Sequence, residues 1–84
     1  MEQPQETKIL FYGTTWCVDC RRAASFFDNH QVNYTFIDID KDKAGRAFVE
    51  KTNNGNRSVP TIVFPDGSIL VEPSLGQLSH KLGI

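Results

Sequence analysis

Hydrophobic residues along this 84-residue chain occur in short runs, some spaced as in strands and others as in helices. The run at 8–12 is almost continuously apolar, which is typical of a central strand covered on both faces. In the segment 19–29, apolar side chains recur every three or four residues, which predicts an amphipathic helix. The apolar stripe of this helix consists of Cys20, Ala23, Ala24, Phe26 and Phe27. The pattern thus predicts a strand and a helix joined by a short turn.

A second strand and a second helix are predicted next. Residues 32–39 alternate between two faces, as in a strand. A connection of this length with a helix inside it favours a parallel pair with the first strand. We then expect a helix at 41–51, with Asp40 as its N-cap. The narrow apolar seam of that helix consists of Ala44, Ala47 and Phe48.

The remaining segments predict a hairpin and a final helix. Strands are expected at 61–64 and 68–71, and the tight turn Pro65-Asp66-Gly67 between them indicates an antiparallel hairpin. Ser74 has the spacing of a capping box for the last helix, which Gly83 is expected to end. The resulting order, β-α-β-α-β-β-α, predicts an α/β fold with a four-stranded mixed sheet flanked by helices.

We expect residues 1–84 to form a single domain, with a loose polar tail at 1–6. The formal net charge of −1 gives no electrostatic reason to expect nucleic acid or an anionic membrane as a partner. No apolar run is long enough to span a bilayer, and residues 1–8 lack the blocks of a signal peptide. These features predict a cytoplasmic protein. We expect it to be a monomer, because no long exposed apolar stripe is evident.

Both cysteines, Cys17 and Cys20, lie at the predicted turn between the first strand and the first helix. The first sulfur is then close to the unpaired N–H groups and the positive end of the helix, which favour its thiolate. The second lies within disulfide reach of the first but is shielded by its own helical turn. This arrangement predicts thiol–disulfide exchange, with Cys17 attacking and Cys20 resolving. Because Cys20 is also on the apolar stripe, a purely structural role remains its alternative.

Pro60 supports the same interpretation. A proline that begins a strand cannot donate a hydrogen bond to the neighbouring strand, so its position needs a special reason. A cis bond between Val59 and Pro60 is one such reason, because it would turn the backbone toward the cysteines. A Cys-x-x-Cys after the first strand of this element order is typical of the thioredoxin-like fold.

At the level of whole motifs, the chain resembles the glutaredoxins of the thioredoxin superfamily, and most of all the bacterial mycoredoxins and glutaredoxin-like proteins. The matching stretches are YGTTWC at 12–17, CR at 20–21, GNRSVPT at 55–61, FPDGS at 64–68 and EPS at 72–74. Each stretch is weak evidence alone, but all of them occur in order and at the family's spacing.

The resemblance implies that the protein reduces mixed disulfides between proteins and a low-molecular-weight thiol. It implies Cys17 as nucleophile, Cys20 as resolving thiol, and the small thiol bound along the backbone of Val59 and Pro60. The chain lacks the Gly-Gly pair that helps glutaredoxins hold the γ-glutamyl end of glutathione. Mycoredoxins also lack this pair. Glutathione, mycothiol and similar thiols therefore all remain open as the co-substrate.

Other residues around the motif have two interpretations each. Trp16 lies across the cysteines as a lid, or it packs ordinarily. Arg57 binds a carboxylate of the small thiol, or it is a charge on a surface loop. Ser74 caps the last helix, and the N–H groups at that helix start are suited to an anionic end of the ligand. Asp19 brings negative charge near Cys17, and Arg21 and Arg22 are the residues that could offset this charge; the alternative for all three is a solvated helix end.

Two other functions compete with mixed-disulfide reduction. A dithiol electron donor reduced by a thioredoxin reductase is the nearer one, although the chain lacks the C-terminal Trp-rich segment usual in such proteins. A dimer that shares an iron–sulfur cluster is the more distant one. The two Cys and two His residues do not have the spacing of a closed zinc site, so we expect no metal.

Overall fold

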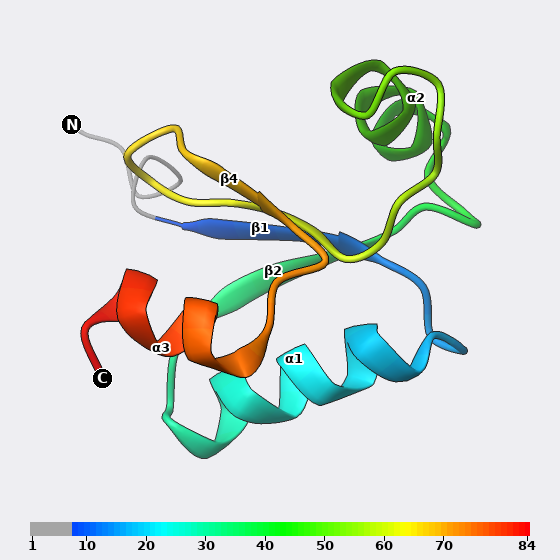
Figure 1. Cartoon of the computed structure of the whole chain (residues 1–84). Coiled ribbons are helices and arrows are strands. Elements are labelled where there is room, and N and C mark those ends of the chain that lie inside the picture. Colours follow the sequence, from blue (N-terminus) through cyan, green and yellow to red (C-terminus); the bar gives the residue numbers. More distant parts are fainter. Residues whose placement is uncertain (1–7) are drawn as a thin grey trace, which may run out of the picture.

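The computed structural model describes residues 8–84, and the expected tail at 1–6 lies outside these residues. The elements are β1 (Ile9–Gly13), α1 (Val18–Asn29), β2 (Tyr34–Asp38), α2 (Lys43–Thr52), β3 (Thr61–Val63), β4 (Ile69–Val71) and α3 (Leu75–Leu82). Their order is the β-α-β-α-β-β-α order that the sequence predicts (Figure 1).

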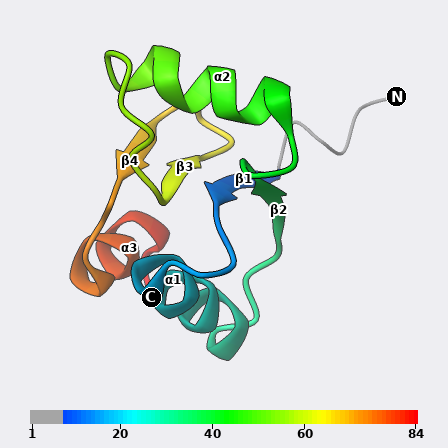
Figure 2. The ribbon, with the colours of Figure 1, turned by 90° about the vertical axis from the view of Figure 1, so that its right-hand side faces the viewer.

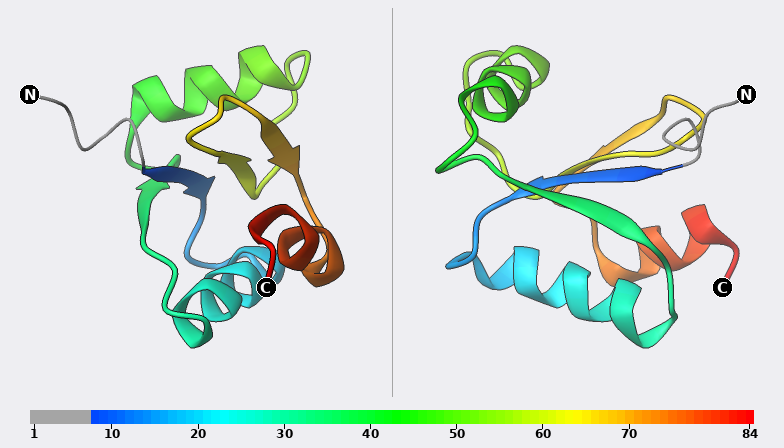
Figure 3. Two further views of the ribbon diagram at one scale, coloured as in Figure 1. Left: turned by 90° about the vertical axis from the view of Figure 1, so that its left-hand side faces the viewer. Right: turned by 180° about the vertical axis from the view of Figure 1, so that it is seen from behind.

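The four strands form one mixed sheet in the order β2-β1-β3-β4. β1 is parallel to β2 and antiparallel to β3, and β3 and β4 form the predicted antiparallel hairpin. Helices α1 and α3 cover one face of the sheet, whereas α2 covers the other (Figures 2 and 3). The central position predicted for the first strand is therefore confirmed, and its nearly continuous apolar run reflects burial on both faces.

Successive residues of β1 supply the two cores. Phe11 is fully buried and belongs to the cluster on the α1/α3 side, where its ring meets that of Phe27 edge-on at 5.9 Å. Tyr12 belongs to the cluster on the α2 side, with Val49. Each fully buried Phe or Val side chain stabilises the fold by about 1.5–3 kcal/mol. Val59, just before β3, packs against both clusters, so the loop that carries it is held at the edge of both cores.

The start of α2 differs from the sequence expectation. Its N-cap is Asp42 rather than Asp40, and the Asp42 carboxylate accepts a hydrogen bond from the N–H of Gly45 at 2.8 Å. The preceding residues form a turn in which the carbonyl of Asp38 accepts from the N–H groups of Lys41 and Asp42. Two acidic residues two positions apart are equally good caps locally, and this turn decides between them.

The apolar seam predicted for α2 is also largely wrong. Ala44 and Ala47 are exposed, whereas Gly45 and Val49 are buried. Only Phe48 is placed as predicted, stacking on Tyr12 with ring centroids 4.7 Å apart. The buried face was missed because its first member is a glycine, which carries no hydrophobic signal.

The other helix boundaries agree closely with the sequence. Ser74 and Gln77 form the predicted capping box of α3, and Gly83 ends this helix in a left-handed conformation with φ 71°. β2 begins at Tyr34 rather than at residue 32, because the N–H of Val32 bonds to the Phe27 carbonyl and closes the end of α1. None of the helices within residues 8–84 is long and apolar enough to cross a membrane.

We predict opposite effects for alanine at two helical glycines. A Cβ at Gly45 would lie 2.8 Å from Cγ2 of Ile37, so Gly45→Ala should push α2 away from β2. The free energy of unfolding should fall by about 1–3 kcal/mol. A Cβ at Gly76 would lie 3.8 Å from its nearest neighbour, Oγ of Ser74, which is an ordinary contact. Gly76→Ala should therefore raise the free energy of unfolding by about 0.5–1 kcal/mol. Urea unfolding measures both, and equal effects at the two sites would contradict the close packing of α2.

Candidate active site

Cys17 occupies the N-cap of α1 with an extended backbone (φ −81°, ψ 124°). Its sulfur accepts a hydrogen bond from the backbone N–H of Cys20 at 3.3 Å. A sulfur in this position receives the N–H groups of the first turn and the positive end of the helix, both of which favour a thiolate. Cys17 is partly exposed, so a disulfide from outside can reach it.

Cys20 lies one turn further along α1, on its inner face, and only 1% of it is exposed. Burial, with a smaller contribution from the neighbouring Cys17, raises the pKa of the Cys20 thiol to about 12, although the backbone and hydroxyl of Thr14 act to lower it. Cys20 is therefore a neutral thiol at physiological pH. The structure thus places two free cysteines in opposite environments, one at a helix cap and one in the core.

The loop before β3 places the backbone of Val59 close to Cys17. The Val59–Pro60 peptide bond is cis, as the sequence predicts. The carbonyl of Val59 lies 4.0 Å from the Cys17 sulfur, a long contact in which the thiol donates. Within residues 8–84, no other group hydrogen-bonds to the Val59 backbone. The backbone of Val59 is therefore available to a ligand attached to Cys17.

Asn53 fixes the conformation of this loop, a role that sequence analysis missed. Its side-chain amide donates to the carbonyl of Val49 at 2.9 Å and to the hydroxyl of Thr61 at 3.2 Å. The Thr61 hydroxyl in turn donates to the carbonyl of Ser58 at 2.7 Å. An Asn in a turn-rich loop gives no sequence signal that distinguishes such an anchor from an ordinary turn residue.

Trp16 is placed by a hydrogen bond rather than by core packing. Its side chain is largely exposed (68%), so the ordinary-packing alternative is wrong. The indole Nε1 donates to Oδ2 of Asp40 at 2.8 Å, which ties the residue before Cys17 to the turn after β2. A lid over the cysteines remains a prediction for Trp16.

Arg57 and Ser74 both have partners within the protein. The Nε of Arg57 lies 2.6 Å from Oε2 of Glu50, in an exposed ion pair of the kind that contributes at most about 1 kcal/mol. The Ser74 hydroxyl accepts from the N–H of Gln77 at 3.1 Å, within the capping box. A ligand carboxylate would therefore share Arg57 with Glu50, and at Ser74 it would meet the helix start rather than the hydroxyl.

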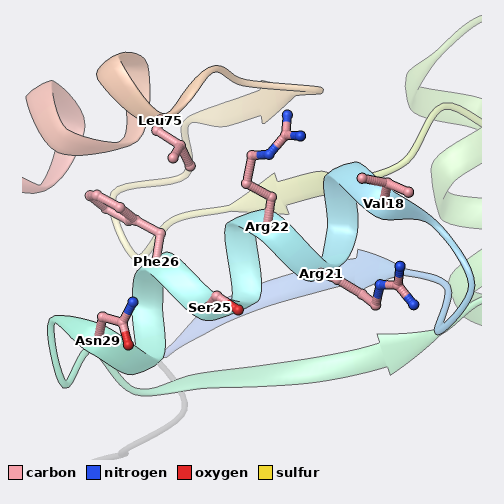
Figure 4. A pocket seen from close by; sticks show the side chains of 7 residues that line it. All are labelled: Val18, Arg21, Arg22, Ser25, Phe26, Asn29 and Leu75. Atoms are coloured by element: carbon pink, nitrogen blue, oxygen red, sulfur yellow. The ribbon is translucent and has the colours of Figure 1, made fainter.

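A groove of about 430 Å³ lies along α1 and reaches Leu75 at the start of α3, and it was not anticipated from the sequence. Figure 4 shows the side chains that line it: Val18, Arg21, Arg22, Ser25, Phe26, Asn29 and Leu75. One of its arginines, Arg22, lies 3.5 Å from the carboxylate of Asp19 in an exposed pair. Within the described part of the chain, no group of three or more His, Cys, Asp or Glu residues is arranged to hold a metal ion.

The mixed sheet, the Cys-x-x-Cys at the start of α1 and the cis-proline loop opposite it define a thioredoxin-like redox protein. The glutaredoxin family model matches residues 9–69, and the chain belongs to the glutaredoxin family. Members of this family are thiol–disulfide oxidoreductases.

Individual relatives agree with this assignment. A Mycobacterium tuberculosis protein whose name places it among the glutaredoxins is 38% identical over 74 residues, covering 88% of each chain. Mycoredoxin 1 of Corynebacterium glutamicum is 32% identical over 76 residues, which cover 90% of this chain and 94% of that protein. Among solved structures, a point mutant of a thioredoxin-like protein superimposes with a TM-score of 0.80 at 28% identity, covering 92% of this chain and 96% of the other.

The buried Cys20 thiol should make the stability of the reduced protein depend on pH. Its pKa is raised from 9.0 to about 12, so between these values the folded state keeps a proton that the unfolded state has lost. The free energy of unfolding should therefore fall as pH rises through this range, by about 2–4 kcal/mol.

The measurement is urea unfolding of the reduced protein at several alkaline pH values, in the absence of oxygen. Tyr12 and Tyr34 also have raised pKa values and add to the fall, but they are common to all variants. Cys20→Ala should therefore lose stability less steeply than the wild type. Cys17→Ser should keep most of the wild-type slope, because burial, the largest cause of the raised Cys20 pKa, remains in that variant. Parallel slopes for the wild type and Cys20→Ala would contradict the burial of this thiol.

Proposed function

We propose that the protein reduces mixed disulfides between proteins and a low-molecular-weight thiol, with Cys17 as the nucleophile and Cys20 as the resolving thiol. One observation carries this proposal: the Cys17 sulfur caps α1, accepts the Cys20 N–H at 3.3 Å and is accessible, whereas Cys20 is a buried thiol. Only one of the two sulfurs is therefore both activated and reachable.

The reaction follows from this asymmetry. The Cys17 thiolate attacks the small-thiol sulfur of the mixed disulfide, forming a new S–S bond to Cys17. The original S–S bond breaks, and its electron pair leaves with the protein sulfur, which takes up a proton from solvent. A second small thiol then attacks the adduct, releasing a small disulfide and the Cys17 thiolate. Alternatively, Cys20 attacks Cys17 and releases the small thiol, leaving a Cys17–Cys20 disulfide.

The small thiol is proposed to lie along the cis-proline loop. A cysteinyl group attached to Cys17 would lie beside the Val59 backbone, 4.0 Å from the sulfur, and could pair with its N–H and carbonyl as an added strand does. Pro60 orients this backbone, Arg57 contacts a carboxylate of the ligand, and Trp16 flanks it. The start of α3 at Ser74 is proposed to hold another anionic end.

The identity of the thiol is left to experiment. Relatedness to a mycoredoxin favours mycothiol, and glutathione remains the alternative. We further propose that the protein acts as a cytoplasmic monomer on protein mixed disulfides. A thioredoxin reductase is the alternative electron source, acting on the Cys17–Cys20 disulfide.

The test compares wild type, Cys17→Ser and Cys20→Ser in reducing a mixed disulfide between a test peptide and a small thiol. Glutathione, mycothiol and cysteine serve in turn as the matched small thiol and reductant. We expect Cys17→Ser to lose activity by about a hundredfold or more, because the remaining cysteine, Cys20, is buried. Cys20→Ser should stay active, and the most effective thiol identifies the co-substrate.

Two outcomes would change the account. Loss of activity in both variants would show that the dithiol route dominates, and reduction by a thioredoxin reductase would then be tested with the wild type. Full activity of Cys17→Ser would refute the assignment of the nucleophile.

A further inference from the structure

The hydroxyl of Thr14 is buried without a partner. Thr14 is 3% exposed, and its Oγ1 has no hydrogen-bond partner within residues 8–84. Burying a hydroxyl without a hydrogen bond is unfavourable, so such groups are rare and call for a specific explanation. Thr14 follows β1 directly, and two residues separate it from Cys17 of the Cys-x-x-Cys.

The Cys20 sulfur sits against the same stretch of backbone. A Cβ added at Gly13 would lie 2.9 Å from Sγ of Cys20, so the sulfur is packed directly on the end of β1. Thr14 is the next residue after Gly13, and its backbone and hydroxyl both act to lower the pKa of Cys20, as donor groups near a sulfur do. The unpartnered hydroxyl is therefore next to the resolving thiol.

A dithiol cycle poses a problem for Cys20. When a thiolate from a small thiol or a dithiol reductant attacks Cys17 in the Cys17–Cys20 disulfide, a new S–S bond forms and the old one breaks. The electron pair of the broken bond stays on Cys20, which becomes a thiolate before it takes a proton from solvent. In the reverse direction Cys20 must lose its proton before it attacks Cys17. Both directions pass through a negative charge on a sulfur that the core shields from water.

We propose that the Thr14 hydroxyl stabilises the transient Cys20 thiolate by donating a hydrogen bond to it when the Cys17–Cys20 disulfide opens or closes. This inference rests on the proposed dithiol branch and assigns Thr14 a catalytic role in it. A neutral thiol is a weak acceptor, whereas a thiolate is a strong one, so the hydroxyl is unsatisfied in the reduced protein and satisfied during the reaction. The buried, unsatisfied hydroxyl thus destabilises the reduced protein, whereas its hydrogen bond stabilises the Cys20 thiolate that forms during the reaction.

The test measures disulfide opening directly. Oxidised protein is mixed with excess dithiothreitol, quenched with an alkylating reagent at set times and analysed by mass spectrometry. Thr14→Val removes the hydroxyl at constant shape, and Thr14→Ser retains it. Thr14→Ala also removes the hydroxyl and replaces Thr14→Val in the test if the valine variant does not fold. Thr15→Val, at the exposed neighbouring threonine, is the matched control.

Thr14→Val should open about tenfold more slowly than the wild type, because a hydrogen bond to a charged group is lost. Closing by oxidised dithiothreitol should slow by the same factor, which leaves the equilibrium between dithiol and disulfide unchanged. Thr14→Ser and Thr15→Val should match the wild type. The denaturation midpoint of reduced Thr14→Val should be no lower than that of the wild type, because the lost hydroxyl has no partner there.

A third comparison isolates Cys20. In a Cys20→Ser background, Thr14→Val should leave the reaction of Cys17 with a small mixed disulfide unchanged. An equal slowing there, a slow Thr14→Ser variant, or wild-type opening rates in Thr14→Val would each overturn the inference. Failure of the proposed function looks different: the wild type would not turn over any peptide mixed disulfide, although its disulfide still opened in dithiothreitol in a Thr14-dependent way.

Discussion

The hydrogen bond from the Cys20 N–H to the Cys17 sulfur is the contact on which the site depends. A helix start leaves N–H groups unsatisfied, and an oxygen from Ser, Thr, Asp or Asn usually accepts from them. In this chain a thiol takes that place, so the group that caps α1 is also a group able to attack a disulfide. The same helical geometry places the second cysteine on the inner side of α1, where it is buried. Capping, activation and shielding thus follow from the position of two cysteines relative to one helix start.

The sheet supplies the rest of the arrangement. Because successive residues of β1 face opposite sides, the strand joins both cores and ends directly beneath the Cys20 sulfur. Val59 packs on both cores as well, which holds the cis-proline loop next to Cys17. Further from the sulfur, the ion pair between Asp66 and Lys81 ties the β3–β4 turn to α3, and it lowers the pKa of the Asp66 carboxyl. The Cys17 sulfur therefore lies where the helix start and the loop meet, on a support that both cores stabilise.

The order of the helices and strands and the position of the cysteine motif were predictable from the sequence, because both depend on local sequence patterns. The apolar run of β1, the Cys-x-x-Cys before a helical stripe, the proline at the start of a strand and the capping box at Ser74 each need only a few neighbouring residues. The start of α2 was missed because two acidic residues compete locally and a turn from β2 decides between them. Its buried face was missed because Gly45 is chosen by its close approach to Ile37, which no local pattern reveals.

The surroundings of the cysteines were less predictable, since they depend on contacts between distant segments. Trp16 meets Asp40, Arg57 meets Glu50, and Asn53 holds Thr61, and in each pair the choice of partner follows from the assembled fold. The unpartnered hydroxyl of Thr14 likewise becomes visible only when the burial of its neighbours is known.

The central claim is that one helix start divides two nearby thiols into an accessible, activated one and a buried, neutral one. Limited alkylation of the reduced wild-type protein with iodoacetamide at neutral pH, followed by peptide mapping, tests it most directly. The account predicts that Cys17 is modified at least about tenfold faster than Cys20. Equal modification of the two, or faster modification of Cys20, would contradict it.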